Sequence, residues 1–190
     1  MDKSLAIVGL KYIAKYVDET DETRLLAEID AEKWSTNLKR RVQHYGYRYD
    51  YRARKIDQSM HLGPLPPWAT QLAARLVVDG HMPLVPDQLI VNEYEPGQGI
   101  SAHTDCVPCF GPLVCSLSLG SDCVMNLSTA RGACPKSMLL ARGSLLVLAE
   151  EARYKWRHAI LGRKFDEVEG RRLPRSRRVS LTFRTVLLEL

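Results

Sequence analysis

The sequence predicts an α+β protein in which two helices precede a β-rich half that folds as a sandwich or barrel. Three observations support this fold class. The 190 residues are 45% hydrophobic and 26% charged, the usual balance of one globular domain with a sizeable core. Helical spacing of apolar residues is confined to the part before residue 80, and short β-rich runs alternate with turn signals from residue 87 onward. No linker divides the chain, so residues 1–190 are expected to form a single domain.

The predicted elements follow in order along the chain. Residues 20–33 are expected to form a helix that Thr20 or Asp21 caps, because either side chain can accept a hydrogen bond from a free backbone N–H. After a Gly/Pro-rich break, residues 68–79 are expected to form a second helix, which Gly80 ends. The predicted strands lie in four later runs: QLIVNEYEPGQG, VCSLSLGSD, SMLLARGSLLVLA and RRVSLTFRTVLL.

Composition limits the partners and the compartment. The net charge of +5 permits a polyanionic partner and suits a mildly basic enzyme equally well. The longest apolar runs fall far short of the roughly 20 residues that a membrane span needs, and the N-terminal stretch lacks the features of a signal peptide. The five cysteines are an odd number, which argues against a disulfide framework and for a reducing compartment. We therefore expect a cytoplasmic monomer without a membrane partner.

The first chemical signal is the pair of His103 and Asp105. Residues two apart on a strand face the same side, so both side chains can reach one ion. His158 is the best candidate for a third ligand, and two histidines with one carboxylate form the facial triad of non-haem Fe(II) oxygenases. Most His-x-Asp pairs are incidental, so this pair depends on the motifs around it.

The second signal is a run with two arginines on one face. Alternation along residues 178–184 places four polar side chains on one side of a strand, and arginine pairs with carboxylates in a two-pronged geometry that suits a dicarboxylate. The alternative is an edge strand with one solvated arginine. Asn92 and Tyr94 share a face of an earlier run and add hydrogen-bond donors. The four polar residues are Arg178, Ser180, Thr182 and Arg184.

Together these motifs resemble the AlkB family of 2-oxoglutarate/Fe(II) dioxygenases. The matching stretches are NEYEPGQGISAHTD, SLSLGSD, RYKWRHAI and RRVSLTFR, and the similarity runs from about Arg41 to Arg184. The segments QHYGYRYDY and YEPGQGI look similar to the branch that contains the animal homologue acting on the wobble uridine of tRNA.

The resemblance implies a fold, a set of cofactors and a chemistry. The fold is a double-stranded β-helix (jelly roll) over residues 87–190, with the N-terminal helices as support. The resemblance implies that His103, Asp105 and His158 hold an Fe(2+) ion, and that O2 and 2-oxoglutarate are the cosubstrates, with ascorbate as reductant in vitro. It also implies a C–H hydroxylation, after which an N-methyl group leaves as formaldehyde and a longer side chain keeps the hydroxyl. The residues implied for 2-oxoglutarate are Arg178 and Arg184, assisted by Asn92 and Tyr94.

The resemblance also places a lid region over the flipped nucleotide, at about residues 30–60. Within it, tyrosines alternate with polar residues along residues 44–52, and aromatic and basic side chains can stack on bases and meet phosphates. The candidate substrate contacts are Tyr45, Tyr47 and, upstream, Arg41. The alternative is an amphipathic strand whose tyrosines pack on the core.

The expected function is an oxygenase that hydroxylates or oxidatively demethylates alkylated nucleobases in RNA or DNA. The alternatives are the same chemistry on tRNA wobble-uridine side chains, on a protein or on a small molecule, and a binding protein that has lost catalysis. Val107 stands where the best-known bacterial relatives carry an acid that reads the base, so their specificity for 1-methyladenine and 3-methylcytosine does not transfer.

Two further groups have open interpretations. Cys106 and Cys109 could form a redox pair or half of a zinc site, but thiols in a loop over the active-site mouth are the favoured interpretation. Cys115 and Cys123 are expected in the core. In a basic cluster before the final strand, the members other than Arg178, which is assigned above, are expected to contact phosphates or to lie in a solvated loop. Its members are Arg171, Arg172, Arg175, Arg177 and Arg178.

Overall fold

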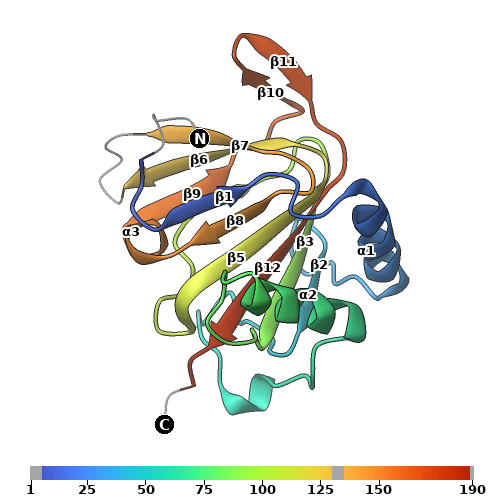
Figure 1. Cartoon of the computed structure of the whole chain (residues 1–190), viewed down its shortest axis with the longest axis vertical. Helices are drawn as coiled ribbons and strands as arrows, with labels where there is room; N and C mark the ends of the chain where they lie inside the picture. Colours follow the sequence, from blue (N-terminus) through green and yellow to red (C-terminus); the bar gives the residue numbers. More distant parts are fainter. Residues whose placement is uncertain (1–5, 130–134, 189–190) are drawn as a thin grey trace.

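The computed structural model describes residues 6–129 and 135–188, and it contains two β-sheets that pack face to face, with the two longer helices on the outer side of the larger sheet (Figure 1). The larger sheet has the strand order β1-β8-β5-β12-β3-β2, and the smaller sheet has the order β4-β9-β6-β7. Every pairing in the two sheets is antiparallel. The prediction of an α+β jelly roll is therefore confirmed.

The strand and helix bounds are as follows. The larger sheet contains β1 (Leu10–Ile13), β2 (Val42–Tyr45), β3 (Gln88–Tyr94), β5 (Phe110–Gly120), β8 (Leu145–Leu148) and β12 (Arg178–Val186). The smaller sheet contains β4 (Ile100–His103), β6 (Cys123–Thr129), β7 (Lys136–Leu140) and β9 (Trp156–Ile160). A separate hairpin of β10 (Phe165–Val168) and β11 (Arg171–Pro174) projects from the sandwich (Figure 1). The helices are α1 (Glu19–Ala31), α2 (Pro67–Val78), α3 (Glu150–Tyr154) and the short 3-10 helix η2 (Gln58–Met60).

Both predicted helices are present, and each begins one residue earlier than expected. Asp18 caps α1, because its side chain accepts a hydrogen bond from the backbone N–H of Asp21 at 2.8 Å, so the expected cap at Thr20 or Asp21 is wrong. Pro67 starts α2, where its missing N–H costs nothing. Gly80 follows α2 with φ at +69°, as expected for a left-handed residue at a helix end.

Two cores hold the layers together. On the outer side of the larger sheet, Leu25 and Ile29 of α1 and Leu72 and Leu76 of α2 pack against alternate residues of β3, β5, β8 and β12. Between the sheets, residues of the smaller sheet pack against the opposite face of β5 and β8. Because side chains on a strand alternate in direction, the same strands that face the helices also face the space between the sheets.

The structure departs from the predicted order of elements at its beginning. Two short strands, β1 and β2, precede the β-rich half and occupy the two edges of the larger sheet. The helices are thus inserted between early strands, and residues 87–190 are not a separate β unit. None of the helices in the described part of the chain has the length and apolar character that a bilayer-spanning helix requires.

A close glycine contact sets the position of β4. A Cβ atom on Gly99 would lie 2.2 Å from the carbonyl oxygen of Ile160, so only glycine lets the turn before β4 approach the end of β9. This approach lets Ile100 pair with Ile160 and His103 pair with His158 across the two strands.

Candidate active site

The three candidate metal ligands come together at one end of the smaller sheet. His103 is the last residue of β4 and lies directly opposite His158 on β9, with their ring centroids 4.3 Å apart. Asp105 lies two residues beyond β4, and its Oδ2 is 3.7 Å from Nε2 of His158. All three residues line one cavity of about 890 Å³. Since β4 ends at His103, it is the turn after the strand that brings Asp105 to this place.

The donor set suits Fe(II), although the carboxylate is engaged elsewhere in this conformation. Asp105 Oδ1 forms an ion pair with Arg184 Nη2 at 2.6 Å, and Oδ2 is the oxygen that faces His158. Within residues 6–129 and 135–188, no three His, Cys, Asp or Glu side chains converge closely enough to hold a metal ion as they stand. Two imidazoles and one carboxylate are nevertheless the donor chemistry of a non-haem iron site, and the Oδ2 atom of Asp105 lies on the side of His158.

The electrostatics keep these groups in the forms that bind a metal. Burial alone would raise the pKa of the Asp105 carboxyl, but Arg184 and the two imidazoles hold that pKa well below its usual range. Burial lowers the pKa of His158 to about 4, and Asp105 opposes this shift only in part. At neutral pH the carboxylate is therefore ionised and the imidazole of His158 is neutral, as metal ligation requires. Nδ1 of His103 lies 2.8 Å from the carbonyl oxygen of Ser101, which fixes the ring orientation.

The arginine face of β12 lies in the same cavity, as the alternation predicted. Arg178 is 3% exposed, and its Nη2 donates to Oγ of Ser118 at 2.8 Å. Its Nε and Nη1 are buried and have no hydrogen-bond partner among the described residues. Arg184 donates to Gln88 through Nη1 at 3.1 Å, and its buried Nε is likewise unpartnered within the described ranges. Buried cationic donors without acceptors are rare, and they mark a place where an anion fits.

Asn92 and Tyr94 also line the cavity, and Arg40, which was not among the predicted substrate contacts, connects them to the lid region (residues 30–60). Nε of Arg40 donates to Oδ1 of Asn92 at 2.8 Å. The guanidinium carbon of Arg40 lies 5.9 Å from the ring centroids of both Tyr94 and Tyr51. The only sequence signal for Arg40 was its place in a short basic run, which gave no reason to prefer it over Arg41.

Two of the three predicted substrate contacts, Tyr45 and Tyr47, are not part of the lining of this cavity. Strand β2 ends at Tyr45, and the chain then turns, so the tyrosines of residues 44–52 do not share one face. The ring of Tyr45 packs edge-on against Trp68 of α2 at 5.7 Å. The ring of Tyr47 packs against His61 at 4.8 Å. Neither tyrosine lines the cavity.

Arg41, the third predicted substrate contact, is held in an ion-pair network outside the cavity. Its Nη2 lies 2.7 Å from Glu93, and its guanidinium stacks over the ring of Trp34 at 4.9 Å. Arg177 pairs with the same carboxylate at 2.6 Å and also with Asp30. These contacts tie the lid region to β3 and to the start of β12.

Other lid tyrosines line the cavity instead. Tyr49 and Tyr51 meet edge to face at 5.0 Å, and both border the cavity. Tyr49 also packs against Phe110 at 5.6 Å. The predicted combination of aromatic and basic side chains is thus present at the cavity, but different members of the run supply it.

The basic cluster divides into structural and exposed members. Arg175 pairs with the buried Asp166 through two hydrogen bonds of 2.6 and 2.8 Å, and Arg177 and Arg178 are engaged as described above. Arg171 and Arg172 lie exposed on the projecting hairpin.

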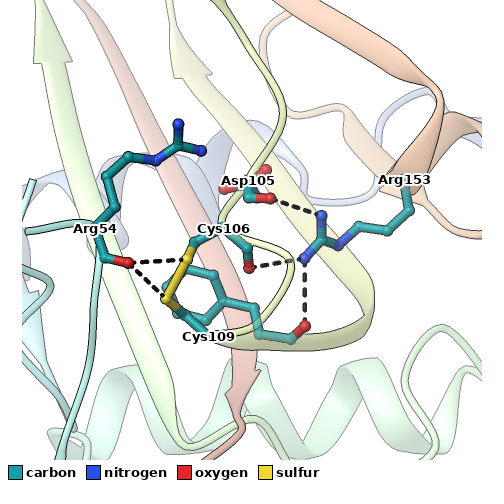
Figure 2. The surroundings of a disulfide bond; sticks show 6 residues. Arg54, Asp105, Cys106, Cys109 and Arg153 are labelled. Carbon is teal, nitrogen blue, oxygen red and sulfur yellow. Dashed lines mark hydrogen bonds between the residues drawn. A yellow bond between two sulfur atoms is a disulfide. The ribbon is translucent and has the colours of Figure 1, made fainter.

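A disulfide bond joins Cys106 and Cys109 directly after Asp105, with their Cα atoms 5.2 Å apart (Figure 2). The expectation of two free thiols in this loop is therefore wrong in the structure. Cys115 and Cys123 are buried and free, as expected. Cys134 lies outside the described residues.

Comparison with known proteins gives the same result as the geometry. The model of the 2OG-Fe(II) oxygenase superfamily matches residues 10–184. An Arabidopsis thaliana protein named alkylated DNA repair protein ALKBH8 homolog is 37% identical over 98% of this chain and 60% of its own length. A Mus musculus protein named tRNA (carboxymethyluridine(34)-5-O)-methyltransferase ALKBH8 is 37% identical over 85% of this chain and 26% of its own length.

The fold also has a solved counterpart. A structure titled "The structure of OsALKBH1" aligns with a TM-score of 0.73 and 17% identity over 93% of this chain and 96% of that one. The chain spans only part of the two curated relatives above, 60% and 26% of their lengths. Because the family model matches nearly its whole length, the chain belongs to the 2OG-Fe(II) oxygenase superfamily. Within it, the chain belongs to the AlkB-like Fe(II)/2-oxoglutarate-dependent dioxygenases.

Proposed function

We propose that the protein hydroxylates or oxidatively demethylates a modified nucleobase of RNA or DNA within the 890 Å³ cavity. One observation carries the proposal: the candidate iron ligands, the buried arginines of β12 and the aromatic and basic side chains of the lid region all line this one cavity. A base taken out of its stack could enter it and lie against the tyrosines.

In this proposal Arg178 binds one carboxylate of 2-oxoglutarate. Two of its nitrogens, Nε and Nη1, have no partner among the described residues and can each donate a charge-assisted hydrogen bond to the cosubstrate, and the guanidinium carbon lies 5.5 Å from the ring of Tyr94. Arg184 holds Asp105 and offers its own unpartnered Nε to the same cavity. Asn92, held by Arg40, limits the space between the cosubstrate and the lid region.

His103, Asp105 and His158 would hold the iron, which when bound supplies the activation of O2 coupled to the conversion of 2-oxoglutarate to succinate and CO2. The chain itself fixes the ligands. Ser101 orients the ring of His103, and Arg184 orients and ionises Asp105. The surrounding apolar side chains, including Leu146 and Leu148, exclude water from this end of the cavity.

The charge of the cavity favours a neutral or anionic base as substrate. Asp105 is the only carboxylate in the cavity lining described by the structure, and it is already neutralised by Arg184. Arg40, Arg54 and Arg157 add positive charge near the mouth. 1-Methyladenine and 3-methylcytosine are cations, so this lining opposes them. The second candidate function, hydroxylation of a wobble-uridine side chain in tRNA, has this charge in its favour and the name of the mouse relative as a parallel.

A monomeric, cytoplasmic enzyme is part of the same proposal. The two buried free thiols suit a reducing compartment. Light scattering on the eluting protein would give its mass in solution, and a mass twice 21.5 kDa would contradict the monomer.

The test is turnover on defined substrates. The protein is incubated with Fe(II), 2-oxoglutarate and ascorbate, together with methylated oligonucleotides or bulk tRNA, and the nucleosides are analysed by mass spectrometry. His158→Ala is the control, because it removes a candidate metal ligand, whose side chain is largely buried in the cavity wall with 13% exposed. We expect a gain of one oxygen on a tRNA nucleoside, or loss of a methyl group from an alkylated base.

The outcomes separate the candidates. Loss of the methyl group from 1-methyladenine would contradict the charge argument and favour a repair enzyme. Succinate without any nucleoside change would contradict a nucleic acid substrate and favour a protein or small molecule. Undiminished succinate production by His158→Ala would contradict the metal site itself.

A further inference from the structure

A second cavity adjoins the candidate active site at the lid region. Its volume is about 580 Å³, and its lining comes from the end of α1, from β2 and from the turns that follow β2. Leu38, Tyr49 and Tyr51 belong to the linings of both cavities, so the two spaces meet at these side chains. The proposed reaction takes place in the first cavity and gives the second no role.

Aromatic rings contribute much of the wall of the second cavity. His44, Tyr45, Tyr49 and Tyr51 all line it, and the ring of His44 meets that of Tyr51 edge to face at 5.7 Å. Tyr49 meets Tyr51 at 5.0 Å, so these three rings form one contiguous group. Such rings can stack on a base of any identity, because every base has a π-face. Tyr45, which the sequence analysis predicted as a substrate contact, borders this cavity and not the first.

The imidazole of His44 is uncharged at neutral pH. Burial is the main reason that its pKa is lowered to about 4, and the positive charges of Arg184, Arg48 and Arg40 add to the lowering. The backbone N–H of Tyr49 donates to Nδ1 at 3.4 Å, so the single ring proton is on Nε2. Nε2 has no hydrogen-bond partner among the described residues, which leaves a neutral N–H donor for the edge of a base.

The charges of the lining favour a ligand that carries a phosphate. Lys33 and Arg48 line the second cavity and are exposed, so an incoming anion can reach both. Glu32 is the only carboxylate in the described lining, and it lies near Tyr45, because its charge helps to raise the pKa of that phenol. Positive charge is thus in excess, and a phosphate is expected at Arg48, which acts on His44, and not at Glu32.

We propose that the second cavity is a subsite for the nucleotide that neighbours the target nucleotide on the same strand. A strand whose target base enters the first cavity passes Tyr49 and Tyr51, and the next base then reaches the second cavity. Its base lies against the rings, and its phosphate meets Arg48. A single-stranded substrate suits this arrangement, because a duplex keeps the neighbouring base paired and stacked. The inference rests on the proposed function, and it adds that the enzyme holds two successive nucleotides.

The first experiment measures binding without turnover. The protein is loaded with Fe(II) and 2-oxoglutarate under nitrogen, and the binding of fluorescein-labelled hexauridylate is followed by anisotropy at several salt concentrations. Arg48→Met should raise the Kd about threefold to tenfold and reduce the slope of log Kd against log salt by about 0.7, because one phosphate contact to a single strand is lost. Arg52→Met is the matched control, since Arg52 is exposed in the same segment and lines neither cavity. No binding by the wild type, or an effect of Arg48→Met no larger than that of Arg52→Met, would overturn the subsite.

The second experiment identifies which neighbour occupies the subsite. A trinucleotide with the reacting base at its centre is compared with two versions that lack the base on the upstream or on the downstream side. The KM should rise about 10-fold for one version and change less than about twofold for the other, because the single subsite stacks one neighbour only. In Arg48→Met the KM for the intact trinucleotide should rise toward that for the mononucleotide.

The inference and the proposed function fail in different ways. If the mononucleotide and the trinucleotide are turned over with the same KM, or if the two versions that lack a base behave alike, the nucleobase reaction stands and the subsite is wrong. If no nucleotide is turned over, the proposed function is wrong, and the comparison of Arg48→Met with Arg52→Met in hexauridylate binding alone decides whether the second cavity holds RNA.

Discussion

The floor of the cavity and its lid region are built in different ways. On the floor, β3, β4, β9 and β12 hold their side chains at a register fixed by hydrogen-bonded neighbours on one or both sides. The lid region contains one short strand, β2, followed by turns and the 3-10 helix η2. Strand β2 pairs with β3 of the floor, and the segments beside it meet the floor through side chains such as Arg40 and Arg41.

We therefore expect the floor and the lid region to have different roles in the enzyme. Groups that must stand in a fixed geometry, His103, His158, Arg178 and Arg184, come from strands whose neighbours fix them. The groups proposed to meet the substrate, such as Tyr49 and Tyr51, come from the turns after β2, where no strand neighbours fix their register. Changes on the floor should therefore affect chemistry and cosubstrate binding, and changes in the lid region should affect only the nucleic acid.

The largest expected effect comes from the candidate iron ligands. His103→Ala should reduce succinate formation by at least about 100-fold, because it removes one of three donors. His61→Ala is the matched control, since His61 is exposed and contacts Tyr47 outside the cavity. Succinate release with and without nucleic acid is the measurement. An active His103→Ala enzyme would show that the floor does not hold the metal.

Two adjacent arginines offer a sharper comparison. Arg178→Met should raise the KM for 2-oxoglutarate about 10-fold to 100-fold, because charge-assisted hydrogen bonds to the cosubstrate are lost. It should not lower the free energy of unfolding, since the buried charge lacks partners for two of its nitrogens among the described residues. Arg177→Met should do the reverse: it leaves Glu93 with Arg41 alone and lowers the free energy of unfolding by about 1–2 kcal/mol.

Both variants are measured by cosubstrate kinetics and urea unfolding. An equal rise in KM in the two variants would mean that the face of β12 does not decide where 2-oxoglutarate binds.

The lid region should give a smaller and more selective effect. Tyr51→Ala should raise the KM for RNA about 10-fold, as expected for the loss of one stacked base, and leave the KM for 2-oxoglutarate unchanged. Tyr45→Phe removes only the hydrogen bond to Gln43 at 3.0 Å, so it should cost about 1 kcal/mol of stability and no RNA affinity. If Tyr45→Phe weakens RNA binding more than Tyr51→Ala, the cavity mouth has been placed on the wrong tyrosines.

The smallest effect concerns pH and the attachment of the lid region. The hydrogen bond from Arg41 lowers the pKa of Glu93 from its ordinary 4.5, burial opposes this, and Arg177 adds to the lowering. A carboxyl whose folded pKa is lowered stabilises the fold fully above its ordinary pKa and loses that contribution as the pH falls through the folded value. The stability difference between wild type and Arg177→Met should therefore shrink below about pH 4.5. Urea unfolding from pH 7 to pH 3 tests this, and a constant difference would contradict it.

The sequence predicted the floor better than the lid region, and strand geometry explains why. Alternation over β12 correctly assigned Arg178, Ser180, Thr182 and Arg184 to one face, because β3 and β5 hold that strand flat on both sides. The same rule applied to residues 44–52 misassigned Tyr45 and Tyr47, because β2 has a partner on one side only and the chain turns at Gly46, with φ at +74°. In the sequence, the glycine at this position was the available sign that the alternation would stop, because glycine readily adopts a positive φ.

Other features depended on contacts that no local pattern contains. The partners of β1 and β2 lie more than 40 residues away, and strands of four residues carry too little periodicity to be recognised. Arg40 and Arg41 are chemically equal in sequence, and only the placement of Asn92 and Glu93 on opposite faces of β3 separates their roles. The pairing of Cys106 with Cys109 required the turn that Arg153 holds.

The nitrogens of Arg178 and Arg184 that lack partners within the described part of the chain have a consequence for the protein inside a cell. A folded chain that contains buried positive charge gains stability whenever a small dicarboxylate enters, by an amount set by the concentration of that metabolite relative to its Kd. Proteases remove unfolded chains first, so the lifetime of the enzyme would follow the supply of its own cosubstrate. In a cell depleted of 2-oxoglutarate the enzyme would become scarcer as well as slower, and abundance would amplify a metabolic signal that kinetics alone would report only weakly.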